Sequence, residues 1–275
     1  MRILQLSDFH LRGDGGLSYR VTDTRRCLNE LVRHLEAMDP APDALVLTGD
    51  LADSGDAAAY EILREALLPL CPRIYALPGN HDRRDRMRAL LGPWCAPDPE
   101  VPDFLCQAVE DLPVRLLLFD SMSPGSHSGH CPPAAARWLD ARLQARPGAP
   151  AIVFMHHPPF RSGMGAMDEP FENLGLLEDI FRRAPWATLA CGHMHRPIFT
   201  LWEGVLAMTS PAIAMQLELD LSPEGGDTFR MECSGYLLHH WNGERLNTHV
   251  CQIPGTPGFD GPYPFADKVN PTEDD

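Results

Sequence analysis

The stretch RILQLSDFH at residues 2–10 sets the pattern of this fold. Its largely apolar run, residues 3–6, is followed by a polar cluster that holds Asp8 and His10. A short apolar run bounded by a polar cluster is typical of a buried strand. The stretch therefore predicts a core strand with a carboxylate and an imidazole just beyond its carboxyl end.

The same pattern recurs along the first two-thirds of the chain. Five more apolar runs, each closed by a polar or glycine-containing cluster, are predicted as strands: 44–47, 73–77, 114–119, 151–155 and 187–191. Helices are predicted at 23–38, 56–68 and 173–184, with another that begins at 132–133. Strands that alternate with helices indicate a layered α/β architecture with an at least partly parallel sheet.

The helical periodicity stops after about residue 197. Further strands, which we expect to be antiparallel, are predicted at 198–201, 205–208, 214–221, 229–233 and 236–241. We predict a catalytic core at 1–205 and, in the same domain, a strand-rich extension at 206–252 that forms a cap or an oligomer contact. The tail at 253–275 is rich in Pro and Gly and is expected to be draped over the surface or disordered.

Composition limits the class of partner. The 275 residues include 23 Lys and Arg against 38 Asp and Glu, which gives a formal net charge of −15. This balance disfavours broad binding to long nucleic acid or to an anionic membrane, whereas a small anionic substrate needs only local positive charge. Eight scattered cysteines and a chain that starts directly with a strand predict a cytoplasmic protein with reduced thiols.

Five polar clusters directly follow predicted strands. They are Ser7-Asp8-Phe9-His10, Gly49-Asp50-Leu51-Ala52-Asp53, Gly79-Asn80-His81-Asp82, His156-His157-Pro158-Pro159 and Gly192-His193-Met194-His195. Ligands of α/β sheets bind beyond the carboxyl ends of the strands, where these clusters would meet. Carboxylates, imidazoles and amide oxygens suit Zn, Mn, Fe or Co. Each cluster alone fits an ordinary turn or a polar strand face, but the five together favour a metal site.

The set resembles the calcineurin-like binuclear metallophosphoesterases, whose signature runs DxH, GDxxD, GNHD or GNHE, H, GHxH. All five elements are present in that order between residues 8 and 195. Their spacing, with Asp120-Ser121 between them, is most similar to the bacterial branch of class III cyclic-nucleotide phosphodiesterases and glycerophosphodiesterases. The resemblance implies a four-layer α/β/β/α sandwich of two mixed sheets flanked by helices.

The resemblance also implies a cofactor of two divalent or mixed-valence transition metal ions, either Mn, Fe, Zn or Co. Asp8, His10 and His195 would hold the first ion, Asn80, His156 and His193 the second, and Asp50 both. Two neighbouring cations need a shared anionic ligand to offset their repulsion. The implied activity is hydrolysis of small phosphodiesters, 3',5'-cyclic nucleotides or glycerophosphodiesters, by attack of an activated water on phosphorus.

The remaining site residues are predicted from their position beside these ligands. His81 is the candidate to give the leaving group a proton, with Asp82 or Asp53 as the group that orients it. Asn80, His81 and His157 are candidates for contact with substrate, and His157 could equally well orient its loop.

Histidines outside the five clusters are expected to matter less. His127 and His130 lie in a Gly/Ser-rich loop and are expected to be exposed. His239 and His240 should face opposite sides of a late strand, so that one of them could approach the site.

Other functions remain open at this point. A phosphomonoesterase or protein phosphatase would use the same metal site, and a non-catalytic interaction scaffold could retain the same fold. A nuclease acting on long DNA fits least, because the acidic composition offers no track for phosphates. A homo-oligomer formed through the C-terminal third is a further expectation.

Overall fold

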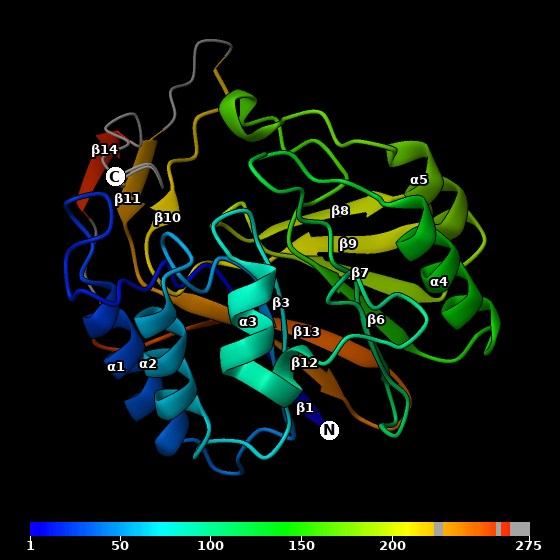
Figure 1. Ribbon diagram of the computed structural model, residues 1–275, viewed down its shortest axis with the longest axis horizontal. Helices are drawn as coiled ribbons and strands as arrows, with labels where there is room; N and C mark the ends of the chain where they lie inside the picture. The colour runs from blue at the N-terminus through cyan, green and yellow to red at the C-terminus, as the bar shows by residue number, and fades with distance from the viewer. Residues whose placement is uncertain (223–227, 257–259, 265–275) are drawn as a thin grey trace.

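The computed structural model describes residues 1–222, 228–256 and 260–264. Two mixed sheets face each other (Figure 1). The first has the strand order β13 (Leu246–Gln252), β12 (Gly235–Trp241), β1 (Arg2–Leu6), β2 (Ala44–Thr48) and β3 (Ile74–Leu77). The second has the order β4 (Gln107–Val109), β5 (Arg115–Leu118), β6 (Ala151–Met155), β7 (Ala187–Cys191), β9 (Val205–Thr209) and β8 (Ile198–Trp202).

Helices cover the outer face of each sheet. The first sheet packs against α1 (Thr24–Glu36), α2 (Ala57–Leu67) and α3 (Arg84–Leu91), and the second against α4 (Pro133–Gln144) and α5 (Leu174–Arg182) (Figure 1). Short 3₁₀ turns lie at Gly92–Cys95 and Gly165–Met167. A third buried layer, which includes Ile3, Val46, Phe154 and Leu237, fills the space between the sheets. These three apolar layers confirm the predicted four-layer sandwich.

The helices start where their sequences provide a cap. The Asp23 side chain accepts a hydrogen bond from the Arg26 backbone N–H, and the Asp56 side chain accepts one from that of Ala59. Each carboxylate satisfies a backbone donor that has no partner within its helix. Helix α3 was not predicted because only Met87 and Leu91 of its eight residues are buried, which leaves too weak an apolar pattern.

The C-terminal strands divide between three sheets. Strand β12 runs antiparallel to β1, as expected. Strand β9 runs parallel to β7, so the expectation of antiparallel pairing is wrong for β9. Strand β13 was missed because its residues are mostly polar and partly exposed at the sheet edge. A small third sheet consists of β10 (Gln216–Leu217), β11 (Thr228–Met231) and β14 (Asp260–Pro264).

Two predicted segments near the C-terminus differ from the structure. The run at 214–221 forms a strand only at Gln216–Leu217, and part of the predicted tail forms β14, whereas residues 257–259 and 265–275 of that tail lie outside the described residues. The domain boundaries at 205 and 252 stay predictions.

The parallel strands determine where the site lies. In the first sheet β1, β2 and β3 are parallel, and in the second β5, β6, β7 and β9 are parallel. Their carboxyl ends therefore lie along one edge of each sheet. Hydrogen bonds from Asp8 N to Gly49 O (3.1 Å) and from Gly192 N to His156 O (3.0 Å) hold neighbouring loops together at these edges.

Candidate metal centre

Every predicted ligand lies in a loop that directly follows one of these strands. Asp8 and His10 follow β1, Asp50 follows β2, Asn80 follows β3, His156 follows β6, and His193 and His195 follow β7. All of these residues except Asn80 are buried. The sandwich thus brings seven side chains from distant parts of the sequence to one place.

The backbone of these loops is unusual. Asp8, His10, Asp50, His193 and His195 all have a positive φ, between 43° and 68°, and they make up five of the nine non-glycine residues with positive φ in the described chain. Such a conformation costs about 1–3 kcal/mol for each residue and persists only where the surrounding structure imposes it. Its concentration here indicates that the loops are shaped to aim these side chains inward.

Three glycines allow the loops to approach one another. A Cβ atom at Gly49 would lie 2.4 Å from His156 Nδ1, and one at Gly79 would lie 2.2 Å from Asp50 Oδ1. A Cβ atom at Gly192 would lie 2.1 Å from Ser7 Oγ. The glycine that precedes Asp50, Asn80 and His193 in each motif is therefore required by close packing, not only by turn geometry.

The first group of side chains consists of Asp8, His10, Asp50 and His195. His10 Nε2 lies 3.0 Å from His195 Nε2 and 3.7 Å from Asp50 Oδ2. His195 Nε2 lies 3.4 Å from Asp8 Oδ1. These four residues place two carboxylates and two imidazole nitrogens around one small volume.

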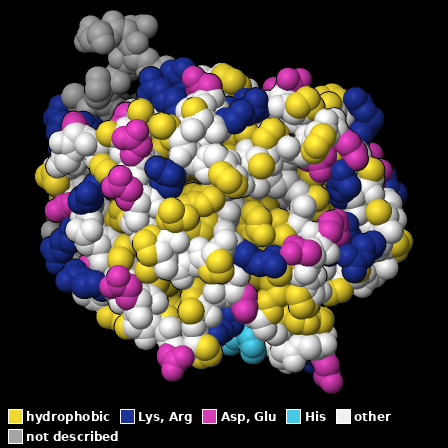
Figure 2. Space-filling model, turned by 60° about the horizontal axis from the view of Figure 1, so that its bottom comes forward, with side chains coloured by type: hydrophobic (Ala, Val, Ile, Leu, Met, Phe, Trp, Pro, Cys, Tyr) yellow, Lys and Arg dark blue, Asp and Glu magenta, His cyan; other side chains and the backbone are white. Residues whose placement is uncertain are grey.

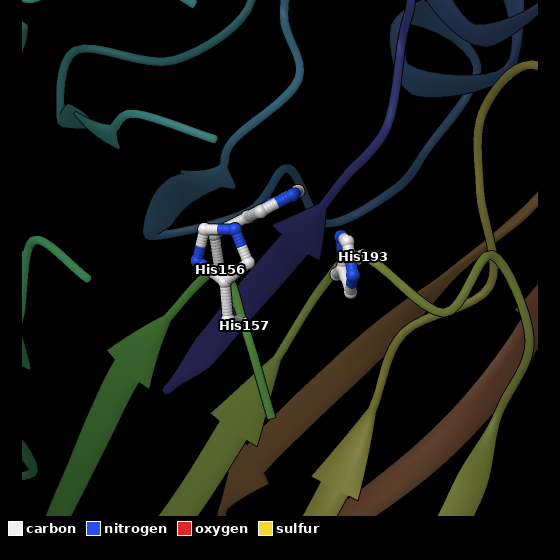
Figure 3. A group of neighbouring side chains, drawn as sticks. All are labelled: His156, His157 and His193. Atoms are coloured by element: carbon white, nitrogen blue, oxygen red, sulfur yellow. The ribbon is translucent and has the colours of Figure 1, made fainter. Parts of the chain in front are cut away.

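The second group adjoins the first through Asp50. His156 Nε2 lies 3.3 Å from Asp50 Oδ2 and 3.1 Å from Asn80 Oδ1. His193 lies beside His156, with ring centroids 5.1 Å apart, and His157 is the third histidine of this group. Figure 3 shows the three rings beyond the ends of β6 and β7, next to the end of β1. The carboxylate of Asp50 therefore contacts both groups.

Backbone carbonyls fix the tautomers of two of these histidines. His156 Nδ1 lies 2.8 Å from Thr48 O, and His195 Nδ1 lies 2.9 Å from Met215 O. A carbonyl can only accept, so both Nδ1 atoms carry the proton and donate, which leaves the Nε2 lone pairs to face the carboxylates. Acceptors that face acceptors in a buried space need a cation between them. The donor set therefore fits a metal ion.

The carboxylates stay ionised despite burial. Burial acts to raise the pKa of Asp50, but nearby histidines, led by His156, bring it well below its usual value. Burial likewise acts to lower the pKa of His156, yet Asp50 and then Asp8 raise it to about 9. Without a metal ion a proton on His156 compensates these carboxylates, and a metal ion would take over that role.

Asp82 belongs to the support of the site. Its carboxylate accepts hydrogen bonds from the backbone N–H groups of Leu51 (3.2 Å) and Gly79 (3.0 Å) and from the Tyr60 hydroxyl (2.9 Å). Burial, with a smaller contribution from Asp50, raises the pKa of Asp82 to about 6. Asp82 thus connects the loops after β2 and β3. The hydrogen bond that orients His81 comes from Asp53 instead.

Asp53 and Ser121 orient the two histidines that neighbour the ligands. His81 Nδ1 lies 2.7 Å from the backbone oxygen of Asp53, which can only accept, so Nδ1 carries the proton. His157 Nδ1 lies 2.9 Å from Ser121 Oγ, and its buried Nε2 has no hydrogen-bond partner among the described residues. The contacts of His81 and His157 with substrate stay predictions.

The groups that support the ligands carry little signal in the sequence. Thr48 and Met215 act through backbone oxygens, which no sequence motif distinguishes. Tyr60 lies on the buried face of α2, where its position is that of an ordinary core residue. The pair Asp120-Ser121 contributes to the family resemblance, but the sequence assigns Ser121 no contact with His157.

The histidines outside the motifs lie in different surroundings. His127 is exposed, and its ring centroid lies 5.8 Å from that of His81, whereas His130 is half-buried. His239 is completely buried between the sheets, and His240 is partly exposed. Opposite orientation of the last two confirms the expected strand alternation.

Comparison with known proteins identifies the family. The family model described as calcineurin-like phosphoesterase matches residues 1–197. The chain belongs to the calcineurin-like phosphoesterase family. Calcineurin-like phosphoesterases of this type use two divalent metal ions, and the two groups of side chains described above are able to hold them.

Relatives of this family member are named as phosphodiesterases. The chain is 31% identical over 274 residues to a probable glycerophosphodiester phosphodiesterase of Arcobacter nitrofigilis, with 98% of both chains covered. It is 30% identical over 243 residues to a cAMP/cGMP dual specificity phosphodiesterase of Mycobacterium tuberculosis, with 86% of this chain and 75% of that protein covered.

A solved structure supports the fold alone. The Plasmodium protein GAP50, described as the anchor in the inner membrane complex, aligns with a TM-score of 0.55 at 14% identity, covering 93% of this chain and 90% of that one. Within the described residues, no helix is both long and apolar enough to cross a membrane.

Proposed function

We propose that this calcineurin-like phosphoesterase is a binuclear metal-dependent phosphodiesterase that hydrolyses small phosphodiesters. The observation that carries the proposal is the position of Asp50. One oxygen of its carboxylate lies 3.3 Å from His156 Nε2 in one group and 3.7 Å from His10 Nε2 in the other. A shared carboxylate between two sets of ligands is the arrangement that two neighbouring cations require.

The assignment of ligands follows the two groups. Asp8, His10 and His195 would hold one ion, Asn80, His156 and His193 the other, and Asp50 both. When bound, the two ions would act as Lewis acids and lower the pKa of a water molecule towards neutrality. Asn80 would supply an oxygen without adding charge, so the site would keep the positive character that attracts a phosphodiester anion.

The chain holds the two acidic ligands in place through its own backbone. The N–H of His193 donates to both oxygens of Asp8 at 3.2 Å, and the N–H of His81 donates to Asp50 Oδ1 at 2.9 Å. These bonds leave other lone pairs of the carboxylates for the ions. They also orient the ligands before substrate binds, which avoids reorganisation during the reaction.

His81 is suited to handle the proton of the leaving group. Its Nδ1 proton is directed at Asp53 O, so Nε2 is the nitrogen left for substrate. The ring is only half-buried and lies edge-on to that of His10, at 4.7 Å between centroids. A protonated Nε2 would donate its proton to the departing alkoxide oxygen.

The substrate class rests on the relatives and on the surface charge. The relatives named above act, by their names, on glycerophosphodiesters and on cAMP or cGMP. On the face seen in Figure 2, Lys and Arg are interspersed with Asp and Glu, which does not favour a long nucleic acid. We therefore propose glycerophosphodiesters or 3',5'-cyclic nucleotides as the substrates.

Metal analysis and a substrate panel test this function together. Purified protein saturated with Mn(II) should hold two ions per chain and should hydrolyse bis(p-nitrophenyl) phosphate faster than p-nitrophenyl phosphate. A faster rate on the monoester would favour the phosphomonoesterase alternative. Absence of turnover on every ester, with two ions bound, would favour the non-catalytic scaffold.

We further propose that the C-terminal third carries a contact between two copies of the chain. Strand β8 is the last strand of the second sheet, and Phe199, Leu201 and neighbouring Leu206 on β9 are exposed. Edge strands with exposed apolar side chains favour association. Light scattering should report a dimer that Leu201→Glu dissociates, and a monomeric wild type would contradict the proposal.

A cytoplasmic location also stays a prediction. All eight cysteines are free thiols, and six of them are buried. Free thiols fit a reducing compartment. Fractionation of cells that express the tagged protein would test this.

A further inference from the structure

The strand that precedes the first ligands contains one buried polar side chain. Gln5 lies between Leu4 and Leu6 in β1 and is completely buried. Its Nε2 donates to Thr48 Oγ1 at 3.1 Å and to Cys191 O at 2.8 Å. Because Cys191 O can only accept, the orientation of the Gln5 amide is determined. The two N–H bonds of this amide are therefore both used.

The other end of the amide contacts a histidine from the C-terminal part of the chain. His239 Nε2 lies 3.2 Å from Gln5 Oε1, and His239 Nδ1 lies 2.9 Å from Thr248 Oγ1. Since Gln5 Oε1 accepts, His239 carries its proton on Nε2 and accepts the Thr248 hydroxyl at Nδ1. Gln5 and His239 thus form a chain of hydrogen bonds in which every buried polar atom has a partner.

This chain of bonds connects the two sheets. Gln5, Thr48 and His239 belong to β1, β2 and β12 of the first sheet, whereas Cys191 ends β7 of the second sheet. Around them the layer between the sheets is apolar. A misplaced Gln5 amide would leave buried donors without partners, so the bond to Cys191 O favours one relative position of the two sheets.

The atoms that Gln5 contacts lie next to the metal-ligand loops. Thr48, whose hydroxyl accepts from Gln5, uses its backbone oxygen to orient His156 and is followed by Gly49 and Asp50. Cys191 is followed by Gly192 and His193, and its oxygen also accepts from Ser210 N at 2.8 Å. A shift at Gln5 would therefore move ligands of both ions relative to each other.

We propose that Gln5 and His239 are positioning residues, which set the distance between the ligand loops of the two sheets and hence the spacing of the metal pair. The inference rests on the proposed binuclear function. It gives His239 on strand β12, 234 residues from Gln5 in the sequence, a role in the site without contact between its side chain and substrate. Mutation of groups that hydrogen-bond directly to metal ligands typically costs about 10–100-fold in metal affinity or activity. Gln5 acts one step further out, through Thr48 and Cys191, so we expect effects at the lower end of that range.

Four single variants test the inference. Gln5→Met and His239→Met remove the hydrogen bonds at similar side-chain volume, whereas His239→Gln keeps an N–H that can reach Gln5 Oε1. The readouts are Mn(II) affinity and the EPR signal of the spin-exchanged Mn(II) pair, with kcat and KM on bis(p-nitrophenyl) phosphate. His240→Met, on the same strand but facing away, is the control.

We expect Gln5→Met and His239→Met to weaken binding of the second Mn(II) about 10-fold, alter the pair signal and lower kcat about 10-fold, with KM within about 2-fold. His239→Gln and His240→Met should match the wild type. The double variant Gln5→Met/His239→Met should be no worse than Gln5→Met, because the two residues act through one path. If Gln5→Met does not fold, His239→Met decides the question.

Two failures can be told apart. If both Met variants melt at lower temperature but keep wild-type Mn(II) affinity, pair signal and kcat, these residues only stabilise the fold and the inference is wrong. If the wild type itself binds fewer than two Mn(II) ions or gives no pair signal, the proposed function fails, and the inference fails with it.

Discussion

Two completely buried histidines, His156 beyond the strand ends and His239 between the sheets, have opposite protonation behaviour. Burial acts to lower the pKa of both. At His156 the negative charge of Asp50 outweighs burial and raises the pKa to about 9. At His239 the hydrogen-bond partners Gln5 and Thr248 are neutral, and the pKa falls to about 3.

The difference teaches how one fold accommodates two kinds of buried polar group. The loops beyond the carboxyl ends of the strands bring together carboxylates and residues with positive φ, and this arrangement suits the binding of cations. The layer between the sheets admits only neutral, fully hydrogen-bonded groups. The charged groups beyond the strand ends are suited to bind metal ions. The neutral, hydrogen-bonded groups between the sheets help to align the two sheets.

The largest effect should come from removing the shared charge at the edge. Asp50→Asn keeps the size of the side chain but removes the anion that contacts both groups, so bound Mn(II) should fall below two per chain. Turnover of bis(p-nitrophenyl) phosphate should fall about 1,000-fold or more. This loss exceeds the one that is typical of residues which only hydrogen-bond to metal ligands. Exposed Asp103→Asn is the control, and near-normal turnover of Asp50→Asn would contradict the assignment.

The second effect concerns packing at the edge. A Cβ atom at Gly192 would lie 2.1 Å from Ser7 Oγ and 2.8 Å from Thr48 O, so Gly192→Ala should destabilise the protein by about 3 kcal/mol and weaken metal binding. Gly175 in α5 has nothing within 4 Å of such a Cβ, and Gly175→Ala should stabilise by about 0.5 kcal/mol. Urea unfolding measures both, and equal effects would show that the edge is not tightly packed.

The third effect is the pH dependence of stability that His239, between the sheets, contributes. Since the folded pKa of His239, about 3, lies below its ordinary value of 6.5, the unfolded chain binds the proton first as pH falls. The His239 contribution is therefore intact above about pH 6.5 and is lost progressively from there towards pH 3.

Urea unfolding of metal-free protein at pH 7 and pH 5 measures this loss. Between pH 7 and pH 5 the free energy of unfolding of the wild type should fall by about 2 kcal/mol more than that of His239→Gln, because glutamine does not titrate. Equal losses in the two proteins would show that His239 is not held neutral in the folded state.

The smallest effect should come from Tyr60, which holds Asp82 in place behind the metal ligands. Tyr60→Phe removes the hydroxyl that donates to Asp82 Oδ1 at 2.9 Å and accepts from Arg83 N at 3.0 Å. Stability should fall by about 1 kcal/mol, while turnover should change by less than about 3-fold, since three backbone N–H groups still hold Asp82. A large loss of turnover would assign Asp82 a more direct role.

Much of the fold could be predicted because its signals are local. The apolar runs before Asp8, Asp50 and His193 each gave a strand close to the observed one. The elements that were missed, such as α3 and β13, bury few side chains and so carry a weak pattern. Parallel pairing of β9 with β7 was missed because strand direction depends on where the chain returns, and periodicity does not record it.

The sequence by itself determined the chemical nature of the site: which carboxylates, imidazoles and amide follow the strands, and which glycines precede them. The family resemblance implied that Asp50 is shared, but only the tertiary structure decided the distances at which Asp50 contacts both groups. It also decided that Asp53 orients His81 through its backbone and that Gln5 reaches across to Cys191. The reason is that residue type and turn preference are encoded over a few neighbouring positions. Interatomic distances between strands, and the electric field that depends on them, arise only when the two sheets pack together.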